Sequence, residues 1–421
     1  MSDTDSVQSD GVQADSFTET TRVSWIERIA RSLLGVVIGP ILIVAAVITL
    51  FWNEGRSAQT ASSLGEGLAL VVEGDPARVD PANEGRLLHL AGDLKTGAPL
   101  TDPEFGIMAT AARLERVVEM FQWKEERQTE TRKVFGGAEE RTTTYTYVRV
   151  WSKKRIDSGA FKHAAGHANP RMRYQGFEVT ARDATLGAFR PDEHALAPLR
   201  PSKSLHLNSL AQINPRLAEK LVAGKIFIGA DPMQPAIGDL RITYRIAPNG
   251  PVSLVGRQAG AGLAEYQTKA GDRLLMASTG IKPAREMFGR AEKENVFATW
   301  VFRILGVIMM LKGFYLILRP LAVFADVIPI VGSIVNAGIG LAALVSTVVL
   351  APLVIAAAWM WIRPIVGLIA VAVGFGVAGL LMTLVDRRGA ARGDDDDVPP
   401  DGTAQRAFGR GGAANLTKAP A

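Results

Sequence analysis

The residues whose types best suit chemistry follow directly on a long apolar run, Leu33–Phe51, and are Asn53, Glu54 and Arg56. A carboxylate held against apolar surface can act as a general acid or base. An ion pair at a bilayer surface can equally be an anchor, because both charged groups reach water. We favour the anchor, in which these residues and Trp52 dock on other helices or on lipid head groups.

Two further polar residues, Asp326 and Asn336, lie in the apolar last third of the chain. A charge at the centre of a bilayer costs about 2.5–3.5 kcal/mol on insertion scales, but Asp326 lies at the end of an apolar run, where that cost largely disappears. Gly332, Asn336 and Gly340 recur every four residues, which predicts a face for close helix packing. The alternative is a catalytic site at the membrane interface built from Glu54, Arg56, Asp326 and Asn336.

Two histidines, His163 and His167, have the spacing of a metal-binding pair. That spacing converges on one ion only in a helix, and Gly166 and Pro170 disfavour a helix here. We therefore predict no metal and no cofactor, and expect His167, Asn169 and Pro170 to fix a turn. The sequence has no cysteine, which excludes disulfides, thiolate metal sites and a cysteine nucleophile.

A glycine-rich run, Gly374–Gly379, matches the pattern G-x-G-x-x-G of dinucleotide-binding proteins. It lies inside an apolar span without a preceding strand, so this context excludes dinucleotide binding. We predict a helix-packing face instead, formed by Ala372, Gly374, Gly376 and Ala378. The chain shows no P-loop and no G-x-S-x-G motif. A large extramembrane domain without a catalytic constellation favours a protein that is not an enzyme.

The composition indicates a membrane protein. Of 421 residues, 48% are hydrophobic and 21% are charged, and the 47 basic and 42 acidic side chains leave a net charge of +5. The apolar residues are concentrated near the two ends of the chain. They predict four transmembrane helices, at residues 32–52, 297–318, 341–362 and 365–385.

Residues 327–362 contain no ionisable group, and as one helix they would extend over about 54 Å, too far for one crossing. We therefore predict a cytoplasmic loop with an interfacial or re-entrant segment at 319–340; part of a long tilted helix is the remaining option. Arginines near both ends predict cytoplasmic tails, disordered at 1–31 and 386–421. The residues expected at the membrane interface or in docking are Trp52, Asn53, Glu54, Arg56, Trp300, Trp361 and Arg363.

The long segment between the first two apolar runs, residues 53–296, then lies in the periplasm or its equivalent. Alternation of apolar and polar residues in 113–126 and 141–151 predicts two strands of a long hairpin joined through Gly136 and Gly137. The fold class expected is an α-helical integral membrane protein with a large inserted β-rich α+β domain.

Several motifs, in order along the chain, carry a resemblance to a known family. They are Phe51–Arg56, Glu66–Gly67, Val118–Trp123, Gly166–Pro170, Gly238–Leu240, Gly271–Asp272, Trp300, Asp326, Asn336 and Arg363–Pro364. On these residues the segment 25–385 resembles the TMEM43 (LUMA) family of four-pass membrane proteins. For eukaryotic members the resemblance implies the endoplasmic reticulum and inner nuclear membrane, and nuclear-envelope organisation through lamin- and emerin-type partners.

The alanine- and arginine-rich composition indicates a bacterial member, so the nuclear role does not transfer literally. We expect an inner-membrane organiser or scaffold whose partners are membrane lipids, further copies of the chain and membrane or peripheral proteins. Nucleic acid is not expected as a partner, because the positive charge is scattered and suits anionic lipid head groups better. The competing hypothesis is a lipid-directed enzyme.

Overall fold

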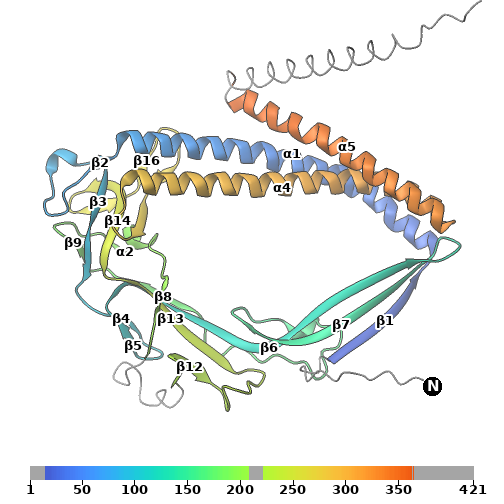
Figure 1. Ribbon diagram of the computed structural model, residues 1–421, viewed down its shortest axis with the longest axis horizontal. Coiled ribbons are helices and arrows are strands. Elements are labelled where there is room, and N and C mark those ends of the chain that lie inside the picture. Colours follow the sequence, from blue (N-terminus) through green and yellow to red (C-terminus); the bar gives the residue numbers. More distant parts are fainter. Residues whose placement is uncertain (1–14, 208–220, 363, 365–421) are drawn as a thin grey trace, which may run out of the picture. The chain divides into compact units, whose positions relative to one another are not determined.

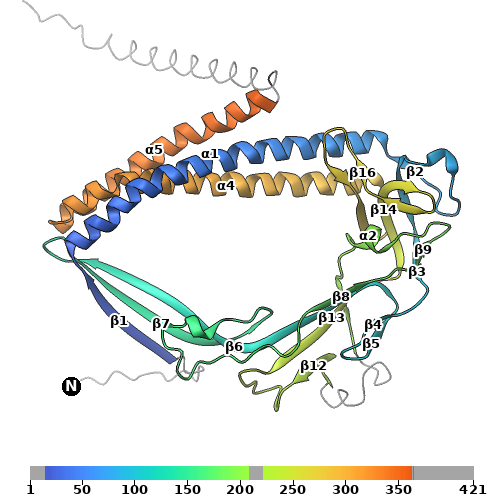
Figure 2. The same ribbon diagram turned by 180° about the vertical axis from the view of Figure 1, so that it is seen from behind.

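The computed structural model describes residues 15–207, 221–362 and 364 (Figures 1 and 2). Within these residues, three helices are long and apolar enough to cross a membrane: α1 (Trp25–Leu70), α4 (Ala284–Ala325) and α5 (Pro329–Ile362). The predicted fourth crossing at 365–385, its packing residues Ala372, Gly374, Gly376 and Ala378, and the tail at 386–421 lie outside the described residues.

Helices α1 and α4 are much longer than the crossings predicted within them. α1 has 46 residues and begins after Ser24, whose side chain accepts a hydrogen bond from the Glu27 amide. α4 has 42 residues. Both continue past the apolar run because their polar residues pair between the two helices, which pack side by side (Figures 1 and 2). The predicted ranges 32–52 and 297–318 therefore mark only the apolar middle of each helix.

The segment predicted as a loop and an interfacial or re-entrant piece, residues 319–340, is mostly helical. α4 continues to Ala325, a short turn follows, and α5 runs unbroken for 34 residues from Pro329. Of the options left open for 327–340, the structure shows the long helix. Proline at its first position costs no hydrogen bond, and the helix satisfies the backbone groups of its glycines internally.

The rest of the described chain forms a β-rich region with two main sheets (Figure 1). The larger has eight strands, six of them in the order β1-β7-β6-β13-β12-β11, with β8 paired to β6 and β10 to β13. Its strands are β1 (Asp15–Val23), β6 (Ala111–Lys133), β7 (Glu139–Ser152), β8 (Phe177–Thr180), β10 (Lys203–Leu205), β11 (Leu221–Val222), β12 (Lys225–Ile228) and β13 (Leu240–Pro248).

The second sheet has six strands, four of them in the order β15-β14-β3-β2, with β18 paired to β14 and β9 to β3. Its strands are β2 (Val72–Glu73), β3 (Leu87–Thr96), β9 (Ala184–Leu186), β14 (Gly250–Ala259), β15 (Gly262–Ala264) and β18 (Met276–Thr279). The smaller elements are β4 (Leu100–Asp102) with β5 (Ile107–Ala109), β16 (Tyr266–Gln267) with β17 (Arg273–Leu274), α2 (Glu193–Leu196) and two short 3₁₀ turns.

The core of this region joins apolar residues of both sheets, among them Leu90, Leu114, Ile242 and Leu254. One buried ionic group lies within it. Arg116 donates to both carboxylate oxygens of Asp102 at 2.9 and 2.8 Å, and the Tyr244 hydroxyl donates to Asp102 at 2.7 Å. Burial and the neighbouring carboxylate raise the pKa of Tyr244 above its ordinary value, so this hydroxyl remains a donor.

The predicted hairpin is confirmed and is longer than expected. β6 and β7 pair from Met120↔Ser152 to Lys133↔Glu139. Gly136 and Gly137 form the turn at φ values of 88° and 78°, a backbone region that side chains with a Cβ rarely adopt.

The expectation of a disordered tail over 1–31 is wrong for residues 15–31, which form a strand and the start of α1. Asp15–Val23 is strand β1, which pairs antiparallel with β7 from Asp15↔Tyr147 to Val23↔Glu139. Its threonines favour a strand, and the edge of β7 supplies the partners that the sequence alone does not reveal. β1 is therefore an edge strand of the larger sheet.

Candidate functional site

The polar residues that follow the first apolar run join α1 to α4. Both carboxylate oxygens of Glu54 accept hydrogen bonds from Arg303, each at 2.7 Å, in a bidentate ion pair. Glu54 is 3% exposed, and the Arg303 guanidinium also lies over the Trp300 ring at 5.0 Å. A pair of this geometry is among the strongest charge-assisted contacts in proteins.

A second group of hydrogen bonds continues the same junction. Asn53 donates to the Thr299 carbonyl at 3.1 Å, and Arg56 donates to the Asn295 side chain at 3.2 Å and to the Thr299 hydroxyl at 3.3 Å. Asn295 in turn donates to the Ser57 carbonyl at 3.0 Å. We call Asn53, Glu54, Arg56, Asn295, Thr299 and Arg303 the helix-junction cluster.

Helical spacing brings the cluster together. Asn295, Thr299 and Arg303 are four residues apart and share one face of α4, and Asn53 and Arg56 share one face of α1. Trp52 extends the contact at its edge, since its ring meets Phe302 at right angles with the centroids 5.5 Å apart. Trp52 and Trp300 are 53% and 56% exposed.

Four glycines bring α1 and α4 into close contact within their apolar stretches. A Cβ at Gly39 would lie 2.7 Å from the Gly313 carbonyl oxygen, and a Cβ at Gly313 would lie 2.8 Å from the Gly39 carbonyl oxygen. A Cβ at Gly35 would meet the Leu316 carbonyl oxygen, and one at Gly306 would meet Leu50. These four glycines were not among the predicted packing residues, although Gly35-x-x-x-Gly39 is a known signal for helix packing in membranes.

A second ionic cluster lies at the turn between α4 and α5. Asp326, 1% exposed, accepts from Arg28 and, at 2.6 Å, from Lys133. Arg28 also pairs with Glu139 at 2.9 Å and donates to the Gly137 carbonyl at 2.6 Å. We call Arg28, Lys133, Glu139 and Asp326 the clasp cluster, since it ties the tip of the β6–β7 hairpin to α1 and α4.

Backbone groups reinforce the clasp cluster. The Trp25 indole nitrogen donates to the Val323 carbonyl at 2.8 Å, and the Gly136 amide donates to the Val327 carbonyl at 3.2 Å. A Cβ at Gly137 would collide with the Trp25 ring, so glycine lets the hairpin approach α1 closely. No local pattern predicts this contact, because its three segments are more than 100 residues apart.

Comparison with known proteins decides the family. A family model described as Transmembrane protein 43 matches residues 120–364, more than half of the chain. Transmembrane protein 43 of Homo sapiens is 33% identical over 361 residues, which cover 82% of this chain and 89% of the relative. The chain belongs to the transmembrane protein 43 family.

Relatives from other animals agree. Transmembrane protein 43 of Mus musculus is 32% identical over 83% of this chain and 89% of its own length. The Transmembrane protein 43 homolog of Drosophila melanogaster is 31% identical over 71% of this chain and 78% of its own length. No solved structure matches the chain. The resemblance to the transmembrane protein 43 family inferred from the motifs is confirmed.

In this family member the four residues of the alternative catalytic site do not meet. Glu54 and Arg56 belong to the helix-junction cluster, whereas Asp326 lies 23 residues beyond Arg303, about 35 Å farther along α4. Asn336 accepts a hydrogen bond from the Tyr315 hydroxyl at 2.8 Å. The arrangement offers no common site for a substrate at these residues.

The predicted packing residues of α5 have different surroundings. Gly332 is packed against Asp326, where a Cβ would overlap the carboxylate. Asn336 contacts α4 through Tyr315, and a Cβ at Gly340 would meet nothing within 4 Å. Trp361 is 80% exposed, and Arg363 lies outside the described residues.

The residues predicted to fix a turn lie against the β6–β7 hairpin. Asn169 accepts from the Trp123 amide at 2.7 Å and donates to the Trp123 carbonyl at 2.9 Å, and Arg155 donates to the Pro170 carbonyl at 3.1 Å. The His167 ring stacks on Tyr147 with centroids 3.9 Å apart. Among the described residues, no group of three or more His, Asp or Glu side chains could hold a metal ion.

Proposed function

We propose that this member of the transmembrane protein 43 family is a membrane organiser or scaffold, which binds lipid or partner proteins through its large β-rich region and self-associates through its helices. The observation that carries the proposal is that the polar residues near the membrane pair with one another. Glu54 is paired with Arg303, and Asp326 with Arg28 and Lys133, so these groups join elements of the chain to one another.

Self-association is supported by the exposed surface of α5. Leu341, Val348 and Leu353 are 62%, 62% and 59% exposed, and added Cβ atoms at Gly338 and Gly340 would meet nothing within 4 Å. Lipid tails are as apolar as these side chains, so burying them against a second helix contributes little free energy of association. The main contribution comes from close packing where small residues let the two backbones approach. The open glycines of α5 supply such a place.

For the location we propose the inner membrane of a bacterium, with the β-rich region on the periplasmic side and the C-terminal tail in the cytoplasm. Arg387, Arg388 and Arg392 follow the last apolar run and support a cytoplasmic tail. The proposed partners are membrane lipids, other copies of the chain and membrane or peripheral proteins, and not nucleic acid.

Chemical crosslinking in native membranes, followed by affinity purification, tests the scaffold proposal. We expect crosslinked species larger than one chain, and their loss when Gly340→Leu fills the open position on α5. Gly289→Leu is the matched control, because Gly289 has equally open space but lies outside the apolar stretches. A lone monomer in the wild-type membranes would overturn the proposal.

The second candidate is an enzyme that acts on lipid at the membrane interface. One observation favours it: the buried Nε of Arg56 has no hydrogen-bond partner among the described residues. A substrate oxygen could supply that partner. Comparing the membrane lipid profiles of the wild type and Arg56→Gln decides the question, since unchanged lipids in the folded variant would remove this candidate.

A further inference from the structure

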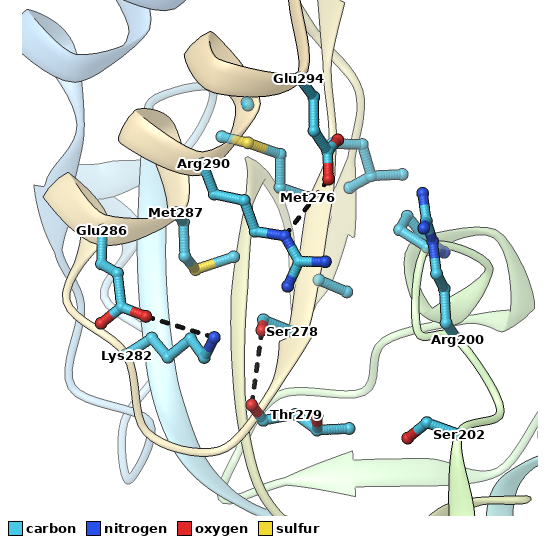
Figure 3. A pocket seen from close by; sticks show the side chains of 14 residues that line it. Arg200, Ser202, Met276, Ser278, Thr279, Lys282, Glu286, Met287, Arg290 and Glu294 are labelled. Carbon is cyan, nitrogen blue, oxygen red and sulfur yellow. Dashed lines mark hydrogen bonds and ion pairs between the residues drawn. The ribbon is translucent and has the colours of Figure 1, made fainter. Parts of the chain in front are cut away.

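A pocket of about 340 Å³ lies between the first turns of α4, strand β18 and the segment around Arg200 (Figure 3). Three cationic side chains line it: Arg200, Lys282 and Arg290. Figure 3 shows Arg290 reaching in from α4 and Arg200 standing on the opposite wall. These residues take no part in the helix-junction cluster or in the clasp cluster.

The charges of the pocket leave one cation in excess. Lys282 pairs with Glu286 and Arg290 with Glu294, each at 3.2 Å and each four residues apart along the chain. Arg200 has no ion-pair partner in the part of the chain that the structure describes. Three cations against two carboxylates give a net charge of +1, so the pocket is suited to an anionic group.

The floor of the pocket is apolar. Met287 is 6% exposed, and Met276, Leu275 and Ala291 are half-buried beside it. The hydroxyl groups of Ser202 and Thr279 stand at the rim with the cations and can donate hydrogen bonds (Figure 3). A ligand that fits both surfaces has an anionic, oxygen-rich head and a hydrocarbon part.

Apolar residues of the floor continue along one face of α4 toward the membrane, with one acidic side chain among them. Met287, Ala291 and Ala298 share this face with Val301 and Leu305, because the spacings of three, four and seven residues return to the same side. Glu294 also lies on this face, where it pairs with Arg290 at 3.2 Å. Val301 and Leu305 are 47% and 45% exposed. Helix α1 packs on a neighbouring face of α4, about 100° around the helix axis, through Thr299, Gly306 and Gly313.

The distances suit a lipid. Arg290 lies 11 residues before Val301, which is about 17 Å along the helix, and seven residues before the apolar run begins at Phe297. Seven residues are about 10 Å along the helix, so a head group held by the long Arg290 side chain would lie at the outer edge of the polar zone of the bilayer, with its acyl chain directed toward Val301 and Leu305.

We propose that this pocket binds the phosphate head group of an anionic phospholipid, with Arg200 and Arg290 as the principal cations and the Met287–Leu305 face of α4 as the seat of an acyl chain. The site would fix a lipid to the β-rich region where α4 enters the membrane. This inference does not depend on the scaffold role, since a folded monomer could bind the same lipid.

Calorimetric titration of the full-length protein in detergent micelles tests the site. The probes are short-chain phosphatidylglycerol, short-chain phosphatidylcholine and inorganic phosphate. We expect phosphatidylglycerol to bind, phosphatidylcholine to bind more weakly, and Arg200→Gln and Arg290→Gln to weaken the binding of phosphatidylglycerol by about fivefold each.

The matched control is Arg78→Gln with Lys153→Gln, which removes two exposed cations that do not line the pocket. Circular dichroism and thermal unfolding should show that all variants remain folded. Equal binding of both lipids, an equal loss in the control, or full binding by the Arg200→Gln/Arg290→Gln double variant would overturn the proposal. Binding of inorganic phosphate as tightly as of phosphatidylglycerol would overturn it in favour of a free-phosphate site.

Discussion

At the scale of single residues, the ion pair between Glu54 and Arg303 shows both what a sequence can reveal and what it leaves hidden. The position of Glu54 after an apolar run predicts an interfacial role, and the structure places it at the junction of two helices. Arg303 was not recognised as its partner, because 249 residues separate the two and no local pattern links them. Burial of a charge makes a partner necessary but does not identify it.

We expect Glu54→Gln to destabilise the protein by about 3 kcal/mol, because it leaves the partly buried guanidinium of Arg303 without its counter-charge. Thermal unfolding in detergent is the measurement. Glu27→Gln is the matched control in the same helix: its pair with Arg31 is exposed, and its loss should cost at most about 1 kcal/mol. The double variant Glu54→Leu/Arg303→Leu should recover most of the loss, and a double variant as unstable as the single one would contradict this explanation.

Asp326 leads to a different prediction, because it joins three segments rather than two. Asparagine at this position cannot balance both Arg28 and Lys133, so Asp326→Asn should release the tip of the β6–β7 hairpin. We expect hydrogen exchange of the Gly136 amide, which donates to Val327, to become faster by about tenfold or more. Glu126→Gln, in an exposed pair with Lys124 on the same hairpin, is the control and should leave this exchange unchanged.

At the scale of elements, the β6–β7 hairpin and the apolar middle of each long helix were predictable, since alternation and hydropathy are local signals. The true lengths of the helices were not. Residues 327–340 contain glycines, a proline and an asparagine, which would favour a break in a helix that is exposed to water. Inside a long apolar helix these residues are tolerated. Strand β1 was missed for the opposite reason, because its polar sequence pairs only when β7 is present.

The close contact of α1 and α4 gives the prediction for this scale. In Gly39→Leu the new side chain would meet Ile317 at 2.5 Å and the Gly313 carbonyl oxygen at 2.7 Å, so the helices must separate. We expect a loss of about 1–3 kcal/mol in unfolding free energy, measured by thermal unfolding in detergent. Gly289→Leu, which enters open space on α4 outside the apolar stretches, is the control, and an equal loss there would contradict the packing argument.

At the scale of the whole molecule, the described residues tie the two ends of α1 to the same β-rich region. Near its start, Arg28 contacts the hairpin tip; near its end, Gly67 packs on Leu274 and Phe288. The sequence predicted a tail and a domain on opposite faces of the membrane, because charge rules treat each apolar run separately. Charge rules take no account of the pairing between β1 and β7, because this pairing exists only in the folded chain.

The pairing of β1 with β7 can be tested directly by introducing two cysteines. Because the chain has no native cysteine, any disulfide that forms must involve the introduced thiols. Thr18 and Thr144 are register partners on β1 and β7, with hydroxyl oxygens 3.2 Å apart. Under mild oxidation in native membranes, Thr18→Cys/Thr144→Cys should form a disulfide within one chain, visible as a shift on a non-reducing gel. Thr18→Cys/Thr131→Cys, which are not partners, should not. If a membrane-impermeant reagent instead labelled Thr18→Cys and Thr144→Cys from opposite faces, a bilayer would separate these strands, and the pairing of β1 with β7 could not hold in the membrane.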